Sequence, residues 1–213
     1  QNPWSAYDPH GLDHLLVVGG VRTLPEQGAH VRSSDQHDKT PNNFTNAAIR
    51  NAKEIASGGG NVTIFIHKSC YDKRGTQDGK VYTDTAEKRA ADFNKANPSA
   101  GKINVAYYND KKELRQGIEA SAQKTQADSF RYYGHQGPSG LLINYGEASG
   151  AGPHPAGIDP PTKLLETVTA SEVGTSLRRG TVASNFETKS YGCNSDDFAK
   201  AMTKEVGRPA MGS

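Results

Sequence analysis

Four short apolar runs constrain the fold of this chain most, because each is rich in Val, Ile, Phe or Tyr and they alternate with helical patterns. This alternation is typical of a mostly parallel β-sheet with helices on both faces. The runs are LLVVGG (15–20), NVTIFIH (61–67), KINVAYY (102–108) and DSFRYYGH (128–135). The sequence therefore predicts an α/β fold, which at 213 residues fits one ordinary domain.

Capping signals predict a helix after each of the first three runs. A polar side chain before a helix can accept hydrogen bonds from the unpaired N–H groups of its first turn. The three glycines at 58–60 would end the first helix. The predicted caps are Asn42 or Asn43 for the first helix, Asp84 with Glu87 for the second and Asp110 with Glu113 for the third.

The pattern changes after the fourth run. Residues 141–144 (LLIN) indicate a short strand or hairpin arm, and 145–163 form a Gly/Pro-rich loop without periodicity. Thr169 with Glu172 can cap a short helix.

A further strand and helix are predicted near the end of the chain. Residues 184–193 alternate through Phe186, Thr188 and Ser190 and end on Cys193. Asp196 and Asp197 can then cap a helix that Gly207 and Pro209 end, and 209–213 would form a last edge strand.

Charge and composition exclude several classes of partner. Lys and Arg number 25 against 23 Asp and Glu, and the basic residues form no run that would follow a phosphate backbone or a membrane surface. No apolar run approaches the roughly 18 residues of a membrane span. The two cysteines, Cys70 and Cys193, are too few for a disulfide framework, so we expect thiols. A soluble domain without an export signal of its own is expected.

His135 and Cys193 are the residues best placed for chemistry, because both stand at the ends of predicted strands. In an open α/β sheet, functional groups gather at the carboxyl ends of the strands. A cysteine between a strand and a helix start is near the positive end of the helix dipole, which stabilises its thiolate. Gly134 and Gly137 would let the chain turn beside His135, and Gly192 would let a substrate carbonyl approach Cys193. The pair could therefore act as nucleophile and general base.

The other histidines have weaker claims. His67 and Cys70 form an H-x-x-C pair, but a structural zinc site usually has a second close pair of ligands, and none follows. We therefore predict neither a metal nor another cofactor. The remaining histidines stand in the tail or in polar stretches and are expected to be solvated: His10, His14, His30, His37 and His154.

From residue 61 onward, over about 150 residues, the chain resembles the caspase-like cysteine peptidases of clan CD. The resemblance lies in four segments in a fixed order. They are NVTIFIH with CYDKRGTQDG, INVAYYNDKKELRQGIEAS, ADSFRYYGHQGPSGLLI, and KSYGCNSDDFAKAM. The resemblance implies a caspase-like three-layer sandwich and a cysteine endopeptidase that works through a Cys-His dyad.

The resemblance also implies roles for individual residues. His135 would be the general base and acid, Cys193 the thiolate, and the amides of Cys193 and of a neighbour of His135 the oxyanion hole. The family usually has Gly directly after the histidine, whereas Gln136 precedes Gly137 here. Either of these two residues could therefore supply the second oxyanion donor.

Two residues are candidates for substrate binding. Arg74 falls where caspases keep an arginine for an acidic P1 side chain, although the following glycine is one residue closer; an ordinary exposed loop arginine is the alternative. Asp159 could instead bind a basic P1 side chain, as in metacaspases and gingipains.

The first 13 residues, QNPWSAYDPHGLD, resemble the end of the Rhs repeat-associated core. In that family the core forms a shell, cleaves itself after this motif and releases a C-terminal toxin. The resemblance implies a bacterial effector, delivered into a recipient cell by a system such as type VI secretion, with the Rhs shell and a cognate immunity protein as partners. The matching residues are Asn2, Pro3, Asp8, Pro9, Gly11 and Leu12.

Two alternatives to proteolysis remain. The same thioester chemistry serves deamidation or transamidation, because it can act on any amide carbonyl. A caspase-like domain without activity could instead bind a partner through its loops.

Overall fold

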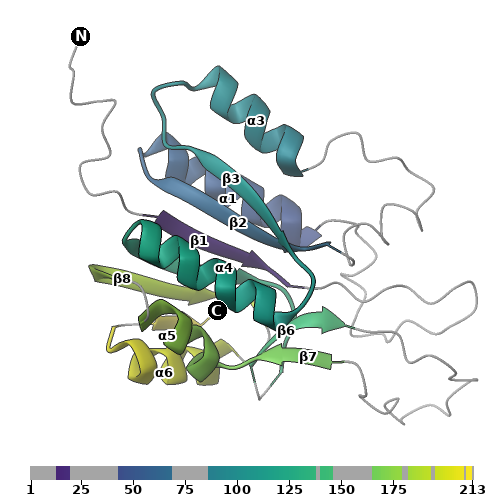
Figure 1. Cartoon of the computed structure of the whole chain (residues 1–213), viewed down its shortest axis with the longest axis vertical. Helices are drawn as coiled ribbons and strands as arrows, with labels where there is room; N and C mark the ends of the chain where they lie inside the picture. Colours follow the sequence, from purple (N-terminus) through teal and green to yellow (C-terminus); the bar gives the residue numbers. More distant parts are fainter. Residues whose placement is uncertain are drawn as a thin grey trace, which may run out of the picture.

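A computed structural model describes residues 13–19, 43–68, 86–137, 140–145, 165–178, 182–192, 195–208 and 210–212 (Figure 1). The described residues form two sheets and five helices. None of these helices is long and apolar enough to cross a membrane.

The main sheet has six strands in the order β3-β2-β1-β4-β8-β9, and every neighbouring pair is parallel. The four predicted runs form its first four strands in chain order, so this part of the prediction is confirmed. The bounds are β1 Asp13–Val18, β2 Asn61–His67, β3 Ile103–Tyr108, β4 Ala127–Tyr133, β8 Val182–Ser190 and β9 Ala210–Gly212.

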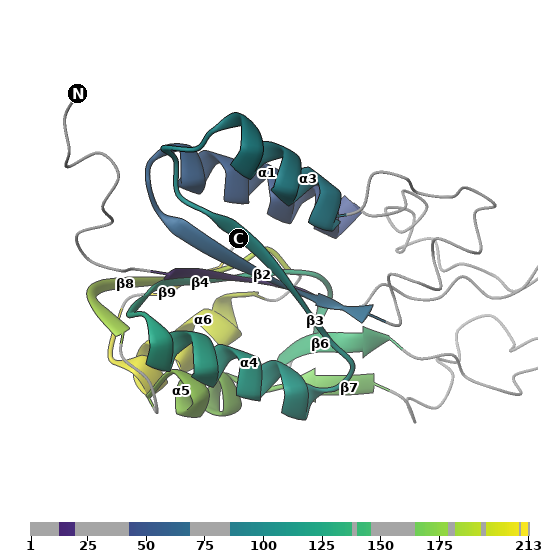
Figure 2. The same cartoon turned by 45° about the horizontal axis from the view of Figure 1, so that its top comes forward.

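The helices cover both faces of this sheet (Figure 2). One face carries α1 (Asn43–Ser57) and α3 (Ala86–Ala96), and the other carries α4 (Lys111–Lys124), α5 (Ala170–Arg178) and α6 (Ser195–Val206). The predicted three-layer α/β sandwich is therefore confirmed. The strand β1 lies between β2 and β4 in the middle of the sheet.

A second, antiparallel sheet was not predicted beyond its middle strand. It contains β5 (Gln136–Gly137), β6 (Gly140–Tyr145) and β7 (Leu165–Val168), in that order. The backbone N–H of Lys111, in the first turn of α4, donates to Oε1 of Glu166 on β7 over 2.9 Å. This bond ties the small sheet to the helix layer beneath the main sheet.

Two of the predicted helix caps are present. The N–H of Glu113 donates to Oδ1 of Asp110 over 2.8 Å at the start of α4. Before α5, Thr169 N donates to Oε2 of Glu172 over 3.0 Å, and Glu172 N donates to Oγ1 of Thr169 over 3.2 Å. Gly59, with φ of +97°, takes the left-handed conformation that ends α1.

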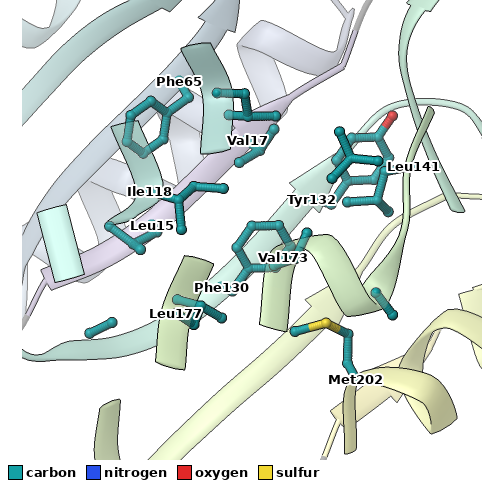
Figure 3. Close-up of a cluster of buried hydrophobic side chains, with 14 of the residues drawn as sticks. Leu15, Val17, Phe65, Ile118, Phe130, Tyr132, Leu141, Val173, Leu177 and Met202 are labelled. Carbon is teal, nitrogen blue, oxygen red and sulfur yellow. The ribbon is translucent and has the colours of Figure 1, made fainter. Parts of the chain in front are cut away.

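The core is divided by the sheet into two clusters. On the α4–α6 face, Phe130 is fully buried among side chains from the strands and helices (Figure 3). The opposite face packs β1 and β2 against α1 and α3, with Leu16 and Ile64 fully buried. Because β1 contributes to both clusters through alternate residues, its run of apolar side chains is nearly continuous.

His14 is not the solvated tail residue that we expected. It belongs to β1, and its Nδ1 lies 2.9 Å from Oγ of Ser129 on β4. Its Nε2 lies 3.5 Å from Oδ2 of Asp128. The expectation was wrong because β1 begins at Asp13, two residues before the apolar run seen in the sequence.

We predict that Phe130→Ala lowers the free energy of unfolding by about 3–5 kcal/mol, because it leaves a cavity in the core that the sheet cannot collapse to fill. Urea denaturation measures this. Lys200→Ala is the control, since Lys200 is 79% exposed, and it should change stability by less than about 0.5 kcal/mol. A loss for Phe130→Ala no larger than that of the control would contradict the packing described.

Candidate active site at the carboxyl edge of the sheet

The carboxyl edge between β1 and β4 is the point where the strand order reverses. From β1 the chain continues outward to β2 and β3, whereas β4, β8 and β9 lie on the other side of β1. In open α/β sheets, ligands bind in the crevice outside the carboxyl ends of strands at such a switch point. His135 follows β4 at this edge, and Gly192 follows the neighbouring strand β8.

The ends of β4 and β8 are in direct contact. Tyr191 N donates to the carbonyl oxygen of Tyr132 over 3.0 Å. A Cβ atom at Gly192 would lie 2.8 Å from Cβ of Gln136 and 2.9 Å from the carbonyl oxygen of Gly134. The residue before Cys193 therefore packs against both neighbours of His135, while Cys193 itself lies outside the described residues.

These contacts explain why glycine stands at two of these positions. We expected Gly192 to let a substrate carbonyl approach Cys193, which stays a prediction; the direction in which a side chain would leave its Cα is filled by Gln136 and Gly134. Gly134 is required because a Cβ there would lie 2.4 Å from the hydroxyl oxygen of Tyr132. At Gly137 the nearest atom to a Cβ would be 3.8 Å away, which is ordinary contact. The packing therefore explains Gly134 and Gly192 but does not require Gly137.

The main chain at His135 is fixed by hydrogen bonds to its carbonyl oxygen. The Tyr132 hydroxyl lies 2.7 Å from this oxygen and 2.8 Å from that of Leu142, and Leu142 N donates to the same His135 oxygen over 3.0 Å. Burial raises the pKa of Tyr132, so the hydroxyl keeps its proton and remains a donor. One proton is thus shared between two carbonyls.

The ring of His135 lies against α1. Its centroid is 5.3 Å from that of Phe44, with the rings nearly perpendicular. This edge-to-face contact restricts the ring on one side. The residue as a whole is partly exposed, and a general base must come within hydrogen-bond reach of the proton that it removes.

Gln136 and Gly137, the candidate oxyanion donors beside the histidine, form β5. They pair with Leu141 and Gly140 of β6. The side chain of Gln136 is buried, and its Oε1 accepts a hydrogen bond from Oγ of Ser190 over 2.6 Å. The assignment of Gln136, Gly137 and Cys193 to an oxyanion hole rests on main-chain N–H groups and stays a prediction.

The helix that follows Cys193 begins close to the same edge. α6 starts at Ser195, which is buried, and only two residues separate it from Gly192. Its positive end favours a thiolate nearby. Asp196 and Asp197 lie in its first turn, where their charges stabilise the helix but oppose a second negative charge. The dipole and these carboxylates therefore act on a nearby thiolate in opposite directions.

His67 ends β2 at the same edge but is a buried core residue. It is 1% exposed, and its ring centroid lies 5.1 Å from that of Tyr108 in an edge-to-face contact. Burial lowers its pKa, and the nearby Glu166 charge opposes this to a smaller extent. Within the described ranges no group of three or more His, Cys, Asp and Glu side chains could hold a metal ion.

Other predicted residues lie outside the described part of the chain. They are Cys70, Arg74 and Asp159, together with the Rhs-like segment up to Leu12. Sequence reasoning also missed residues that the structure brings to the edge. Ser190 carried a signal, since it lies on the alternating face that the structure buries with Phe186 and Thr188. No sequence signal distinguishes Tyr132, because a tyrosine inside an apolar run cannot be told from any other aromatic residue of the core.

Comparisons with known proteins add little to this geometry. No model of a known family and no curated protein matches the chain. Among solved structures, it is similar to the crystal structure of lactate dehydrogenase from Eimeria maxima with NADH and oxamate, at 11% identity and a TM-score of 0.40. The match covers 95% of this chain and 43% of that one, so this chain spans less than half of that enzyme. A likeness this weak supports no conclusion about function.

We predict that Tyr132→Phe lowers the free energy of unfolding by about 1–3 kcal/mol, because the part-buried carbonyls of His135 and Leu142 lose a shared donor. Tyr133→Phe is the matched control. The Tyr133 hydroxyl donates to Oδ1 of Asn51, which also accepts from Arg131, so its removal should cost less. Chemical denaturation of both variants measures the difference. An equal or smaller loss for Tyr132→Phe would contradict the shared hydrogen bond.

The lowered pKa of His67 predicts a loss of stability in acid. The unfolded chain binds a proton near the ordinary value of 6.5, whereas the folded protein binds it only at lower pH, so acid favours unfolding. Relative to His67→Phe, the wild-type melting temperature should fall as pH drops from about 7.5 to about 5. Thermal melts across this range measure it. A difference between the two proteins that does not change with pH would disprove the effect.

Proposed function

We propose that this protein is a cysteine endopeptidase in which Cys193 is the nucleophile and His135 is the general base and acid. The observation that carries the proposal is the packing of Gly192 against Gly134 and Gln136. It supports the pairing because the chain immediately before the cysteine touches the chain on both sides of the histidine. The ends of β4 and β8 also lie beside the switch point between β1 and β4, where α/β proteins bind their ligands.

The reaction would proceed through a thioester. His135 accepts the thiol proton of Cys193, and the sulfur attacks the carbonyl carbon of the scissile peptide bond. Main-chain N–H groups stabilise the oxyanion that forms. When the C–N bond breaks, the leaving amine takes the proton from His135 and the acyl group stays on sulfur. His135 then removes a proton from water, whose oxygen attacks the thioester, and the thiol is regenerated as the carboxylic acid leaves.

We infer further that the domain is a delivered toxin that cuts a protein of the recipient cell. This rests on the Rhs-like motif in residues 1–13 together with the dyad. An Rhs shell and an immunity protein would then be its partners, and activity would be harmful to a cell that lacks the immunity protein. Arg74 and Asp159 remain the candidates for the P1 side chain.

We predict that Cys193→Ala and His135→Ala each lower proteolysis by at least about 10³-fold, because each removes a group that takes part in every turnover. The full chain and both variants are expressed in bacteria, and growth is recorded together with new protein N-termini identified by mass spectrometry. Cys70→Ala, the matched control for loss of a thiol, should keep both the toxicity and the new N-termini.

Several outcomes would contradict the peptidase proposal. Full toxicity and cleavage in either dyad variant would exclude the dyad. A mass increase of about one dalton on target Gln or Asn side chains, without new N-termini, would indicate deamidation by the same thioester chemistry. Equal labelling of Cys193 and Cys70 by an iodoacetamide probe would favour a binding module without activity, since only an activated thiol reacts preferentially.

A further inference from the structure

We propose that the side chain of Gln136 is a positioning residue that holds the chain at Ser190 and Gly192, just before Cys193, against the segment that carries His135. This inference rests on the proposed function, since it gives Gln136 a role in that reaction. Its role as a candidate oxyanion donor concerned only its main-chain N–H. The side chain contributes something different, because it joins the two strand ends through the interior.

The hydrogen bond between Ser190 and Gln136 is the central observation. Oγ of Ser190 donates to Oε1 of Gln136 over 2.6 Å, at the short end of O–H···O distances. Ser190 is 1% exposed and Gln136 is 6% exposed. A buried polar pair loses more when it is broken than an exposed pair, because water does not replace the missing partner. The bond therefore holds two residues that are 54 positions apart.

The contact with Gly192 makes the side chain of Gln136 a spacer as well as an acceptor. A Cβ at Gly192 would lie 3.2 Å from Oε1 and 2.8 Å from Cβ of Gln136. The side chain thus fills the space under the main chain at Gly192 while it holds Ser190 two residues earlier. A shorter side chain at position 136 would leave a gap beneath the main chain of Gly192.

The segment on the histidine side of this hydrogen bond is held by further hydrogen bonds. Gln136 follows His135 directly, and it pairs with Leu141 in the ladder between β5 and β6. The carbonyl oxygen of His135 accepts from Leu142 N and lies within hydrogen-bond distance of the Tyr132 hydroxyl. The segment at His135 would consequently not follow a displacement of Gly192, and the end of β8 would move relative to the histidine.

The neutral amide of glutamine is also suited to this place. A glutamate has the same length and could accept the same hydrogen bond, but it would add a negative charge beside the turn. Such a charge opposes formation of a thiolate and raises the pKa of the thiol. Gln136→Glu therefore keeps the length of the side chain and an acceptor for Ser190, while it replaces the amide NH₂ by a charged oxygen.

The chain offers a matched control at the opposite edge of the same two strands. Nε2 of Gln126, just before β4, donates to the carbonyl oxygen of Val182 at the start of β8 over 3.0 Å. This bond also joins β4 to β8, but it lies at the amino ends of the strands. Gln126→Ala should lower stability without affecting chemistry at the carboxyl edge.

The test measures the rate at which iodoacetamide alkylates Cys193 as a function of pH, by mass spectrometry of the full chain, with Cys70 as the internal reference. In the wild type we expect a midpoint below the value of about 8.5 of a free thiol, because the cysteine is paired with His135. Gln136→Ala and Ser190→Ala should move the midpoint toward that of a free thiol and slow alkylation at neutral pH about tenfold.

Gln136→Glu should raise the midpoint by about one pH unit relative to the wild type, even where its melting temperature is unchanged. Gln126→Ala should keep the wild-type midpoint. Asp196 and Asp197 are present in all these proteins, so their charges do not contribute to the differences. If Gln136→Ala fails to fold, Ser190→Ala still tests the loss of the hydrogen bond, and Gln136→Glu still tests the effect of the added charge.

The possible failures can be told apart. Wild-type midpoints in Ser190→Ala and in every folded Gln136 variant, with a shifted midpoint in His135→Ala, would overturn the positioning role and leave the dyad intact. A free-thiol midpoint in the wild type that His135→Ala does not change would overturn the dyad, and the positioning role with it. Equal shifts in Gln126→Ala and Gln136→Ala would show that lost stability alone explains the effect, and would also overturn the proposal.

Discussion

Parallel pairing of β4 with β8 is the constraint on which the candidate site depends. Two parallel strands that are hydrogen-bonded to each other end at the same edge, so residues that follow them meet whatever their separation in the sequence. In this chain the pairing extends to Tyr132 and Ser190, and the residues beyond them, including His135, Gln136 and Gly192, are brought together as a result. The helices and the second sheet pack against the main sheet and hold this edge in place.

Buried polar groups give this edge its particular shape. The hydroxyl of Tyr132 contacts two carbonyl oxygens, and that of Ser190 is bonded to the Gln136 side chain. Because such groups are costly to leave unsatisfied in an apolar environment, they favour one arrangement of the loops over many of similar apolar packing. The close approach of Gly134 to the Tyr132 hydroxyl follows from the same arrangement, since a side chain there would displace the donor.

Much of the main sheet could be predicted from the sequence, because a strand buried on both faces needs a continuous apolar run and a helix start needs a capping residue. The runs around Leu16, Ile64 and Phe130 satisfied the first condition, and Asp110 and Thr169 satisfied the second. The second sheet was only partly predictable, since β5 has two residues and β7 follows a Gly/Pro-rich segment.

For the candidate site, the sequence predicts only that two strands end close together. That His135 and Gly192 stand at one edge follows from the α/β pattern, but the inward course of the Gln136 side chain depends on Ser190, which is far away in the sequence. His14 was misjudged for a similar reason. Its partners, Ser129 and Asp128, come from a strand that pairs with β1 only in the folded molecule.

The central position of β1 has a consequence for any processing of the chain. β1 begins at Asp13 and lies between β2 and β4, with its residues paired on both sides. A cut within it would divide the sheet through its middle and expose both apolar clusters, whereas trimming an edge strand would remove pairing on one side only. A cut that leaves the fold intact would therefore have to fall outside Asp13–Val18.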